Sequence, residues 1–140
     1  MTDAPPTVGL DVGATLCKLA VVGSGLTTEH HPSTDLAVVR RRVEALAPAR
    51  VAATGGGASE LGATLAGRPV AHVSEFDAWA GGAPIVAADE GVALPARYLL
   101  VSLGTGTSIL AIDGTRATRL LRHSVALAEF RFHLITQVLR

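Results

Sequence analysis

Two stretches of the chain place glycines and hydroxyl residues directly after an apolar run, a pattern that can bind phosphate. Residues 11–18 read Asp-Val-Gly-Ala-Thr-Leu-Cys-Lys, and residues 99–108 read Leu-Leu-Val-Ser-Leu-Gly-Thr-Gly-Thr-Ser. Glycine permits positive φ and close approach of a ligand, and successive N–H groups in such a turn form an anion site. Hydroxyls add donors or help to hold hydrated magnesium. For the second stretch, a plain hairpin turn is the alternative. Its candidate groups are Gly104, Thr105, Gly106, Thr107 and Ser108.

Two carboxylates, Glu75 and Asp77, directly follow an expected central strand at residues 69–73. Open α/β sheets place their chemistry at the carboxyl ends of strands. A carboxylate there can accept the proton of a substrate hydroxyl that attacks phosphorus. The alternative is helix capping, in which Ser74 or Asp77 satisfies free N–H groups. We favour capping for Asp77, whereas both interpretations stay open for Glu75.

The composition indicates an α/β protein of one ordinary domain. The chain has 140 residues, of which 49% are hydrophobic and only 4% aromatic, so its core must be built from Ala, Val and Leu. Its 12 basic residues balance 12 acidic ones, which argues against nucleic acid or an anionic membrane as a partner. The sequence shows neither a signal peptide nor a membrane span, and we expect a cytoplasmic protein.

Several other residues invite chemical interpretations that a structural role explains better. Cys17, the one cysteine, cannot form an internal disulfide and suits a buried strand position better than a nucleophile. Lys18 beside it is an exception: it is the only lysine, and a chain so poor in lysine has little reason to place one by default. Residues 40–42, three arginines in an expected helix, point in different directions and indicate a solvated face rather than a phosphate patch. The 5 histidines lack ligand spacing, which argues against a metal site among them.

The order of elements is clear from periodicity and from glycine and proline. A three-stranded meander should open the chain and lead to a helix with Leu36, Val39, Val43 and Leu46 on one face. The triple glycine at residues 55–57 either presents helix N–H groups to a ligand or allows close packing. The expected strands are 8–11, 16–22, 26–31, 51–54, 69–73, 98–103, 109–112 and 115–120, and the remaining helices are 59–65 and a segment from about 74 to 89.

In this order the motifs resemble those of type II (eukaryotic-type) pantothenate kinases, members of the sugar kinase, heat-shock chaperone and actin ATPase superfamily. These enzymes open with Asp-x-Gly-Gly-Thr-x-x-Lys, which residues 11–18 match with Ala14 at the second glycine. A Thr-Gly-Gly turn follows, matched by residues 54–56, and then a Glu-Phe-Asp-Ala segment, matched in full by residues 75–78. The last motif is Gly-Thr-Gly-Thr-Ser, matched in full by residues 104–108.

The resemblance implies a fold and a division of the chain. The expected fold is a ribonuclease H-like mixed sheet with flanking helices, as in the first domain of an actin-like ATPase, plus the opening β-hairpins of a truncated second domain. Residues 1–94 would form the first domain and residues 95–120 the start of the second. Residues 121–140 depart from the family pattern and would form a divergent tail, and the half that closes over adenosine in the family has no counterpart.

The resemblance also implies ATP-dependent phosphorylation of pantothenate to 4′-phosphopantothenate, the first step of coenzyme A biosynthesis. ATP would place its phosphates between the two glycine loops, and Asp11 would position Mg²⁺ through water. Glu75 would act as general base on the primary hydroxyl of pantothenate, and Arg119 would bind that substrate. The active form would be a homodimer. The implied phosphate-binding residues are Asp11, Gly13, Thr15, Lys18, Gly104, Thr105, Gly106, Thr107 and Ser108.

Three hypotheses follow for this chain. It is a pantothenate kinase whose missing half another chain supplies, or it is an inactive or regulatory remnant that keeps phosphate binding. The third is a related sugar kinase or an acyl-CoA dehydratase activating ATPase. Activating ATPases need cysteines for an iron–sulfur cluster, which Cys17 alone cannot provide.

Overall fold

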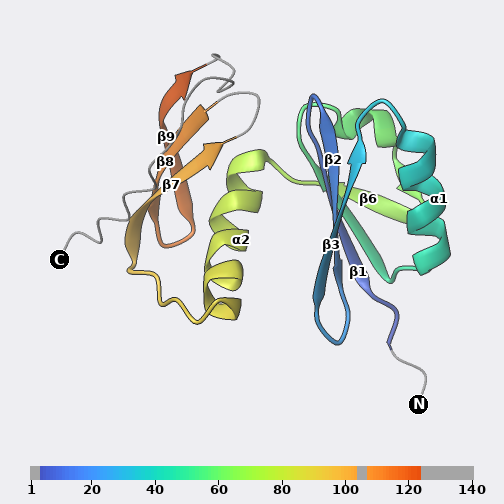
Figure 1. Ribbon diagram of the computed structural model, residues 1–140, viewed down its shortest axis with the longest axis horizontal. Helices are drawn as coiled ribbons and strands as arrows, with labels where there is room; N and C mark the ends of the chain where they lie inside the picture. The colour runs from blue at the N-terminus through green and yellow to red at the C-terminus, as the bar shows by residue number, and fades with distance from the viewer. Residues whose placement is uncertain (1–3, 104–106, 124–140) are drawn as a thin grey trace.

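The computed structural model describes residues 4–103 and 107–123, which build two β-sheets and two long helices (Figure 1). The larger sheet has six strands in the order β3-β2-β1-β4-β6-β5, and the smaller has three in the order β7-β8-β9. The strands are β1 Thr7–Val12, β2 Leu16–Val22, β3 Leu26–Pro32, β4 Arg50–Thr54, β5 Thr64–Leu65, β6 Arg68–His72, β7 Arg97–Leu103, β8 Thr107–Asp113 and β9 Arg116–His123. The helices are α1 Leu36–Leu46, the short 3-10 helix η1 Ala58–Leu61 and α2 Glu75–Asp89.

The six-stranded sheet is mixed, as the sequence predicts. Strands β1, β2 and β3 form an antiparallel meander, whereas β1 pairs in parallel with β4, and β4 in parallel with β6. Parallel pairing requires a crossover, and α1 provides the one between β3 and β4. The carboxyl ends of β1, β4 and β6 consequently lie at one edge of the sheet.

The prediction of a helix over residues 59–65 is wrong. Residues 59–65 do not form a helix: η1 covers Ala58–Leu61, and β5 then pairs antiparallel with β6. Gly62, at φ +76°, ends η1 after a single turn because its backbone leaves the helical region. Apolar residues at short spacing here serve a turn and a strand, which periodicity over so few residues cannot distinguish from a helix.

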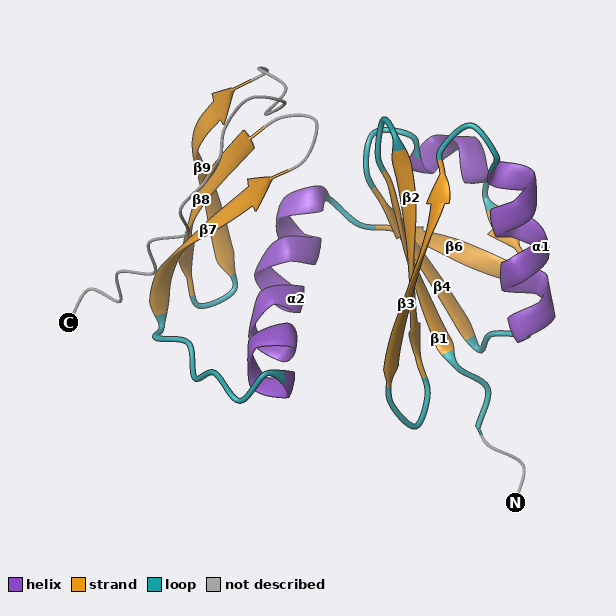
Figure 2. Cartoon of the chain, in the orientation of Figure 1, coloured by secondary structure: helices purple, strands orange, loops and turns teal. Residues whose placement is uncertain are grey.

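Helix α1 covers one face of the six-stranded sheet (Figure 2). Asp35 begins the helix by accepting the N–H of Val38 at 3.3 Å, and Ala47 ends it in the left-handed conformation. Val39 and Val43 are fully buried. They pack on alternate residues of the strands, since one face of each strand points toward the helix. This core contains Val8, Leu10, Val12, Cys17, Leu19, Val51, Ala53 and Leu61.

Helix α2 packs against the three-stranded sheet, where Ala80 lies in a core with Leu110 and Ile112. Phe76 and Trp79 border this core, with ring centroids 6.1 Å apart. Thus α2, which the sequence-based division assigns to the first domain, contributes its buried side to the second sheet. The boundary at residue 94 itself remains a prediction. Within the described residues, no helix is both long and apolar enough to span a membrane.

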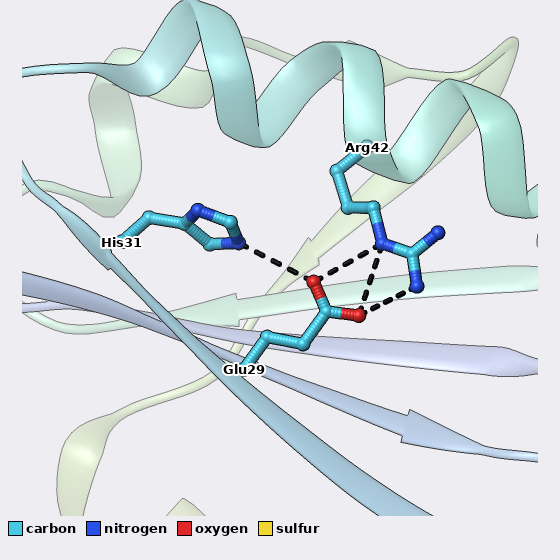
Figure 3. A network of polar contacts seen from close by, with 3 residues as sticks. All are labelled: Glu29, His31 and Arg42. Carbon is cyan, nitrogen blue, oxygen red and sulfur yellow. Dashed lines mark hydrogen bonds and ion pairs between the residues drawn. The ribbon is translucent and has the colours of Figure 1, made fainter.

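A polar cluster joins β3 to α1 on the surface (Figure 3). Glu29 accepts hydrogen bonds from Arg42, at 2.6 Å from Nη2 and 2.9 Å from Nε, and His31 Nε2 lies 3.4 Å from Glu29 Oε2. The hydrogen bonds from Arg42 hold the pKa of Glu29 below its ordinary value, and His31 adds to this effect. The cluster thus favours the ionised carboxylate.

Replacement of Glu29 by Gln should make stability less dependent on acid pH. A lowered pKa in the folded state stabilises the protein fully above the ordinary glutamate pKa, and this contribution is lost as the pH falls through the lowered value. We expect Glu29→Gln to lower the urea midpoint at about pH 7 and to change it less at about pH 3. Glu44→Gln, at an exposed position of α1, is the control. An equal loss for Glu29→Gln at both pH values would contradict the prediction.

Candidate functional site

Asp11 and Lys18 face each other across the first hairpin. They are register partners of β1 and β2, and Lys18 Nζ lies 2.8 Å from Asp11 Oδ2. Their neighbours Val12 and Cys17 are buried on the α1 side, so the charged pair lies on the opposite face of the sheet. The Lys18 side chain is 54% exposed and the Asp11 side chain 28%. A solvent-accessible cation and carboxylate are therefore paired just before the first glycine turn.

Cys17 takes no part in this accessible pair. Its side chain is fully buried, and burial, with a smaller effect of the Asp11 carboxylate, raises the pKa of its thiol. A buried, protonated thiol is a poor nucleophile. The structure thus supports the interpretation of Cys17 as a core residue.

The turn from β1 to β2 is fixed by hydrogen bonds from two sides. Gly13 N–H donates to Leu16 O at 3.0 Å, and Gly13 O accepts from Ser33 Oγ at 2.7 Å. Ser33 N–H also donates to Thr15 O at 3.0 Å. Ser33 therefore ties the end of β3 to the loop that carries Gly13 and Thr15. Ser33 is not among the site residues predicted from the sequence; its only signal is its place two residues after the strand expected at 26–31.

The triple glycine lies against the end of β1. Gly57 N–H donates to Val12 O at 3.0 Å. A Cβ on Gly55, which has φ +93°, would lie 2.5 Å from Val12 O and 2.8 Å from Asp11 Oδ1, and a Cβ on Gly57 would lie 2.7 Å from Val12 Cγ1. Of the two interpretations of this segment, the structure supports close packing. It also brings the Thr54 turn to the backbone next to Asp11.

Thr54 adds an unsatisfied polar atom beside Asp11. The two residues are register partners of β4 and β1, on the face of the sheet away from α1. Thr54 Oγ1 is buried and has no hydrogen-bond partner within the described part of the chain. Buried hydroxyls are nearly always satisfied, by protein or by an ordered water. A carboxylate and a free hydroxyl side by side are suited to orienting the water shell of a Mg²⁺ ion.

A hollow of about 340 Å³ adjoins the same turns. Of the predicted binding residues that the structure describes, only Gly13 lines it. Among the described residues, Glu60 contributes the one carboxylate of the lining; it lies in the 3-10 helix η1 and is not among the site residues predicted from the sequence. The lining residues are Val12, Gly13, Ala14, Ser33, Thr34, Gly56, Gly57 and Glu60.

Glu75 lies at the same sheet edge, two strands from Asp11. The chain leaves β6 with Val73 N–H donating to Ala53 O at 2.9 Å, and Glu75 is the first residue of α2. Because β1, β4 and β6 are consecutive neighbours, the strands bearing Asp11 and leading to Glu75 are separated by roughly 10 Å.

Ser74 and Asp77 form the cap of α2. Ser74 Oγ accepts the Asp77 N–H at 3.1 Å and donates to Asp77 Oδ2 at 2.7 Å. The capping interpretation of Asp77 is therefore confirmed. These bonds leave the Glu75 carboxylate out of the cap.

Arg119 reaches the start of α2 from β9. Its guanidinium Cζ lies 4.4 Å from the centre of the Phe76 ring, a cation–π contact. Since Phe76 follows Glu75 directly, the predicted substrate-binding arginine and the predicted base are brought to one region. No local sequence pattern predicts Phe76 as the residue that Arg119 contacts.

The second glycine loop is described only in part. Gly104, Thr105 and Gly106 lie outside the described residues. Thr107 and Ser108 begin β8 and are half-buried, and Thr107 pairs with Leu103 at the end of β7. Among the residues with described positions, no three His, Cys, Asp or Glu side chains gather into a metal-binding group.

Comparison with known proteins finds similarity in structure alone. No protein-family model matches the sequence. No curated protein matches it significantly. A Ppx/GppA family member from Aquifex aeolicus matches with TM-score 0.57 and 12% identity, over 87% of this chain and 52% of that chain. The type II variant of the Aquifex aeolicus Ppx/GppA phosphatase matches with TM-score 0.55 and 9% identity, over 89% and 53%. The ethanolamine utilization protein EutJ from Carboxydothermus hydrogenoformans matches with TM-score 0.51 and 16% identity, over 88% of this chain and 53% of that chain.

The chain has the actin-like ATPase fold. The predicted fold class is thereby confirmed. At these identities the likeness concerns the fold and not a particular activity. The chain spans about half the length of the matched structures, 52% to 53% of each.

Substitution of Gly55 should destabilise the protein far more than substitution of Gly56. Gly55→Ala puts a Cβ against Val12 O in a left-handed backbone conformation, whereas a Cβ on Gly56 meets nothing within 4 Å. We expect Gly55→Ala to lower the free energy of unfolding by about 2 kcal/mol or more. Gly56→Ala should change it by less than about 0.5 kcal/mol. Denaturant titration of both variants measures this, and equal losses would contradict the packing described.

Proposed function

We propose that this chain carries the phosphate-binding and general-base half of an ATP-dependent kinase, with pantothenate as the acceptor. The observation that carries the proposal is the common edge of β1, β4 and β6, where Asp11, the Thr54 turn and Glu75 follow neighbouring parallel strands. The actin-like ATPase fold supports nucleotide chemistry at this edge. The match of residues 75–78 and 104–108 to the motifs of type II pantothenate kinases supports the acceptor.

The phosphates of ATP would bind at the Gly13 turn. Ser33 holds this loop from behind, which lowers the entropy cost of binding at its backbone. Lys18 is exposed and can move from Asp11 to a phosphate, because an exposed ion pair contributes little that binding must replace. Gly104 to Ser108 would supply donors from the second loop.

The residues present fit a hydrated Mg²⁺ ion. Asp11 provides a partly exposed carboxylate, and Thr54 Oγ1 is a buried oxygen without a partner in the described residues. Both groups would orient water molecules of the ion rather than replace the whole shell, since Mg²⁺ dehydrates reluctantly. When bound, the ion neutralises charge on the phosphate oxygens.

Glu75 would accept the proton of the acceptor hydroxyl. The hydroxyl oxygen bonds to the γ-phosphorus, the bond from that phosphorus to the β–γ bridging oxygen breaks, and ADP leaves. The position of Glu75 in the first turn of α2 suits a general base, because Ser74 and Asp77 cap the helix and leave the Glu75 carboxylate free of that role. Arg119, stacked on Phe76, is suited to the carboxylate of pantothenate.

The rest of the nucleotide site would come from outside the described residues. The chain spans about half of the structures that share its fold. We propose that a homodimer or a further part of the protein covers the adenosine. A phosphate-binding remnant without turnover is the competing function.

Replacement of Glu75 by Gln should abolish turnover of pantothenate. Incubation of the chain with Mg-ATP and pantothenate, followed by mass spectrometry, measures phosphopantothenate directly. We expect Glu75→Gln to lower kcat about 100-fold or more, because general-base assistance contributes at least that much. Asp89→Asn, at the last residue of the same helix, is the matched control and should keep the parent rate.

The alternatives give different results in the same assay. Phosphorylation of glucose but not of pantothenate would assign a sugar kinase. Release of phosphate from ATP without an acceptor would assign hydrolysis. Absence of turnover in a chain that circular dichroism shows to be folded would overturn the kinase proposal and leave the remnant.

A further inference from the structure

Four polar residues, one on each of the neighbouring strands β3, β2, β1 and β4, lie in a transverse row on the sheet face away from α1. In that order they are His30, Lys18, Asp11 and Thr54, each the register partner of the next. Register partners project to the same face and lie side by side. Asp11 is the one acid of this row, and within the described residues it is the only ion-pair partner of Lys18. The lysine thus has no second carboxylate beside it in the row.

The Asp11 carboxylate is engaged on both of its oxygens. Oδ2 lies 2.8 Å from Lys18 Nζ. Oδ1 faces the Gly55 turn so closely that a Cβ on Gly55 would lie 2.8 Å from it. The oxygen left for the water shell of an ion is therefore Oδ2, which Lys18 occupies. A cation that uses Asp11 and a phosphate that uses Lys18 both require the same ion pair to open.

We infer that the Lys18–Asp11 ion pair keeps the candidate site closed to a cation alone or a phosphate alone, an inference that rests on the proposed function. A cation alone has to displace Lys18 from Asp11, and a phosphate alone has to displace Asp11 from Lys18. Either ligand leaves one charged side chain without its counter-ion. The second ligand then binds to a pair that is already open. The two affinities are therefore coupled, and the coupling is reciprocal.

The exposure of the pair sets the size of this coupling. The Lys18 side chain is 54% exposed and the Asp11 side chain 28%, so water competes for both groups. The opening of an exposed ion pair changes a binding equilibrium by about two- to five-fold. The device is thus a modest bias toward a cation and a phosphate bound together, and not a lock.

The single lysine of the chain provides a direct signal for the state of the pair. Because Lys18 is the only lysine, the one lysine ε-methylene signal in a carbon-13 NMR spectrum of the full chain belongs to it. We expect Mg²⁺ alone to move this signal toward its position in Asp11→Asn, where no carboxylate holds the ammonium. Sodium chloride at the same ionic strength is the control and should leave the signal in place. Mg²⁺ that shifts the backbone signal of Asp11 and leaves the Lys18 signal unchanged would overturn the inference.

Substitutions in the pair should act in opposite directions on the two ligands. Lys18→Met releases Asp11, and we expect it to tighten binding of Mg²⁺ alone about two- to five-fold and to weaken binding of pyrophosphate alone. Asp11→Asn releases Lys18 and should do the reverse. Arg50→Met is the control, since it removes a cation from the same sheet face roughly 13 Å along β4 from Thr54, beyond the range of screened charges.

Backbone NMR shifts at the Gly13 turn measure both affinities. An equal gain in Mg²⁺ affinity for Lys18→Met and Arg50→Met would contradict a role of the ion pair.

Binding and turnover together separate the ion-pair device from the proposed kinase activity. Opposite effects of Lys18→Met and Asp11→Asn in a chain that phosphorylates no acceptor would support the device and contradict the kinase. Phosphorylation of pantothenate by a chain in which Lys18→Met does not tighten Mg²⁺ binding would contradict the device alone. A parent chain that binds neither Mg²⁺ nor pyrophosphate would overturn both.

Discussion

The parallel pairing of β1 with β4 and of β4 with β6 is the constraint on which the candidate site depends. It places three strand ends at one edge, so that Asp11 and Thr54, far apart in sequence, are register partners, and Glu75 begins the helix that follows the next strand, β6. The pairing in turn depends on close backbone approach. Gly57 donates to Val12 O, and Gly55 leaves room for that carbonyl and the Asp11 carboxylate. Geometry at the edge is therefore fixed by the absence of two Cβ atoms.

Most of the fold could be predicted because each element carries a local signal. The alternation of β1 and β2, the helical spacing from Leu36 to Leu46 and the glycine turns between strands are properties of short segments. The actin-like ATPase fold class is what the resemblance of the motifs, in this order, to a known family implies, and the structure confirms it. The helix predicted for residues 59–65 was wrong because four residues of 3-10 helix and a two-residue strand are too short to show a periodicity. Gly62 determines where the 3-10 turn ends.

Contacts between distant segments could not be predicted from local sequence patterns. Ser33 holds the Gly13 loop only because β3 pairs with β2 to its last residue, and Arg119 meets Phe76 only because α2 lies on the second sheet. Glu60 enters the lining of the hollow through the η1 turn. Each depends on a register or a packing partner that no local pattern encodes. The roles of the binding residues themselves remain predictions.

The strand pairs that flank the two glycine loops differ in charge. In the first hairpin the residue before the last of β1 is Asp11, and its partner is Lys18. In the second, the residue before the last of β7 is Ser102, and its partner is Ser108. Hydroxyls can donate to phosphate but carry no charge to hold a cation or offset an anion. In the proposed site, the ion and the phosphates would therefore be held mainly from the β1–β2 side, and the β7–β8 side would contribute neutral donors. Two hairpins with the same pairing pattern would thus contribute unequally to the proposed site.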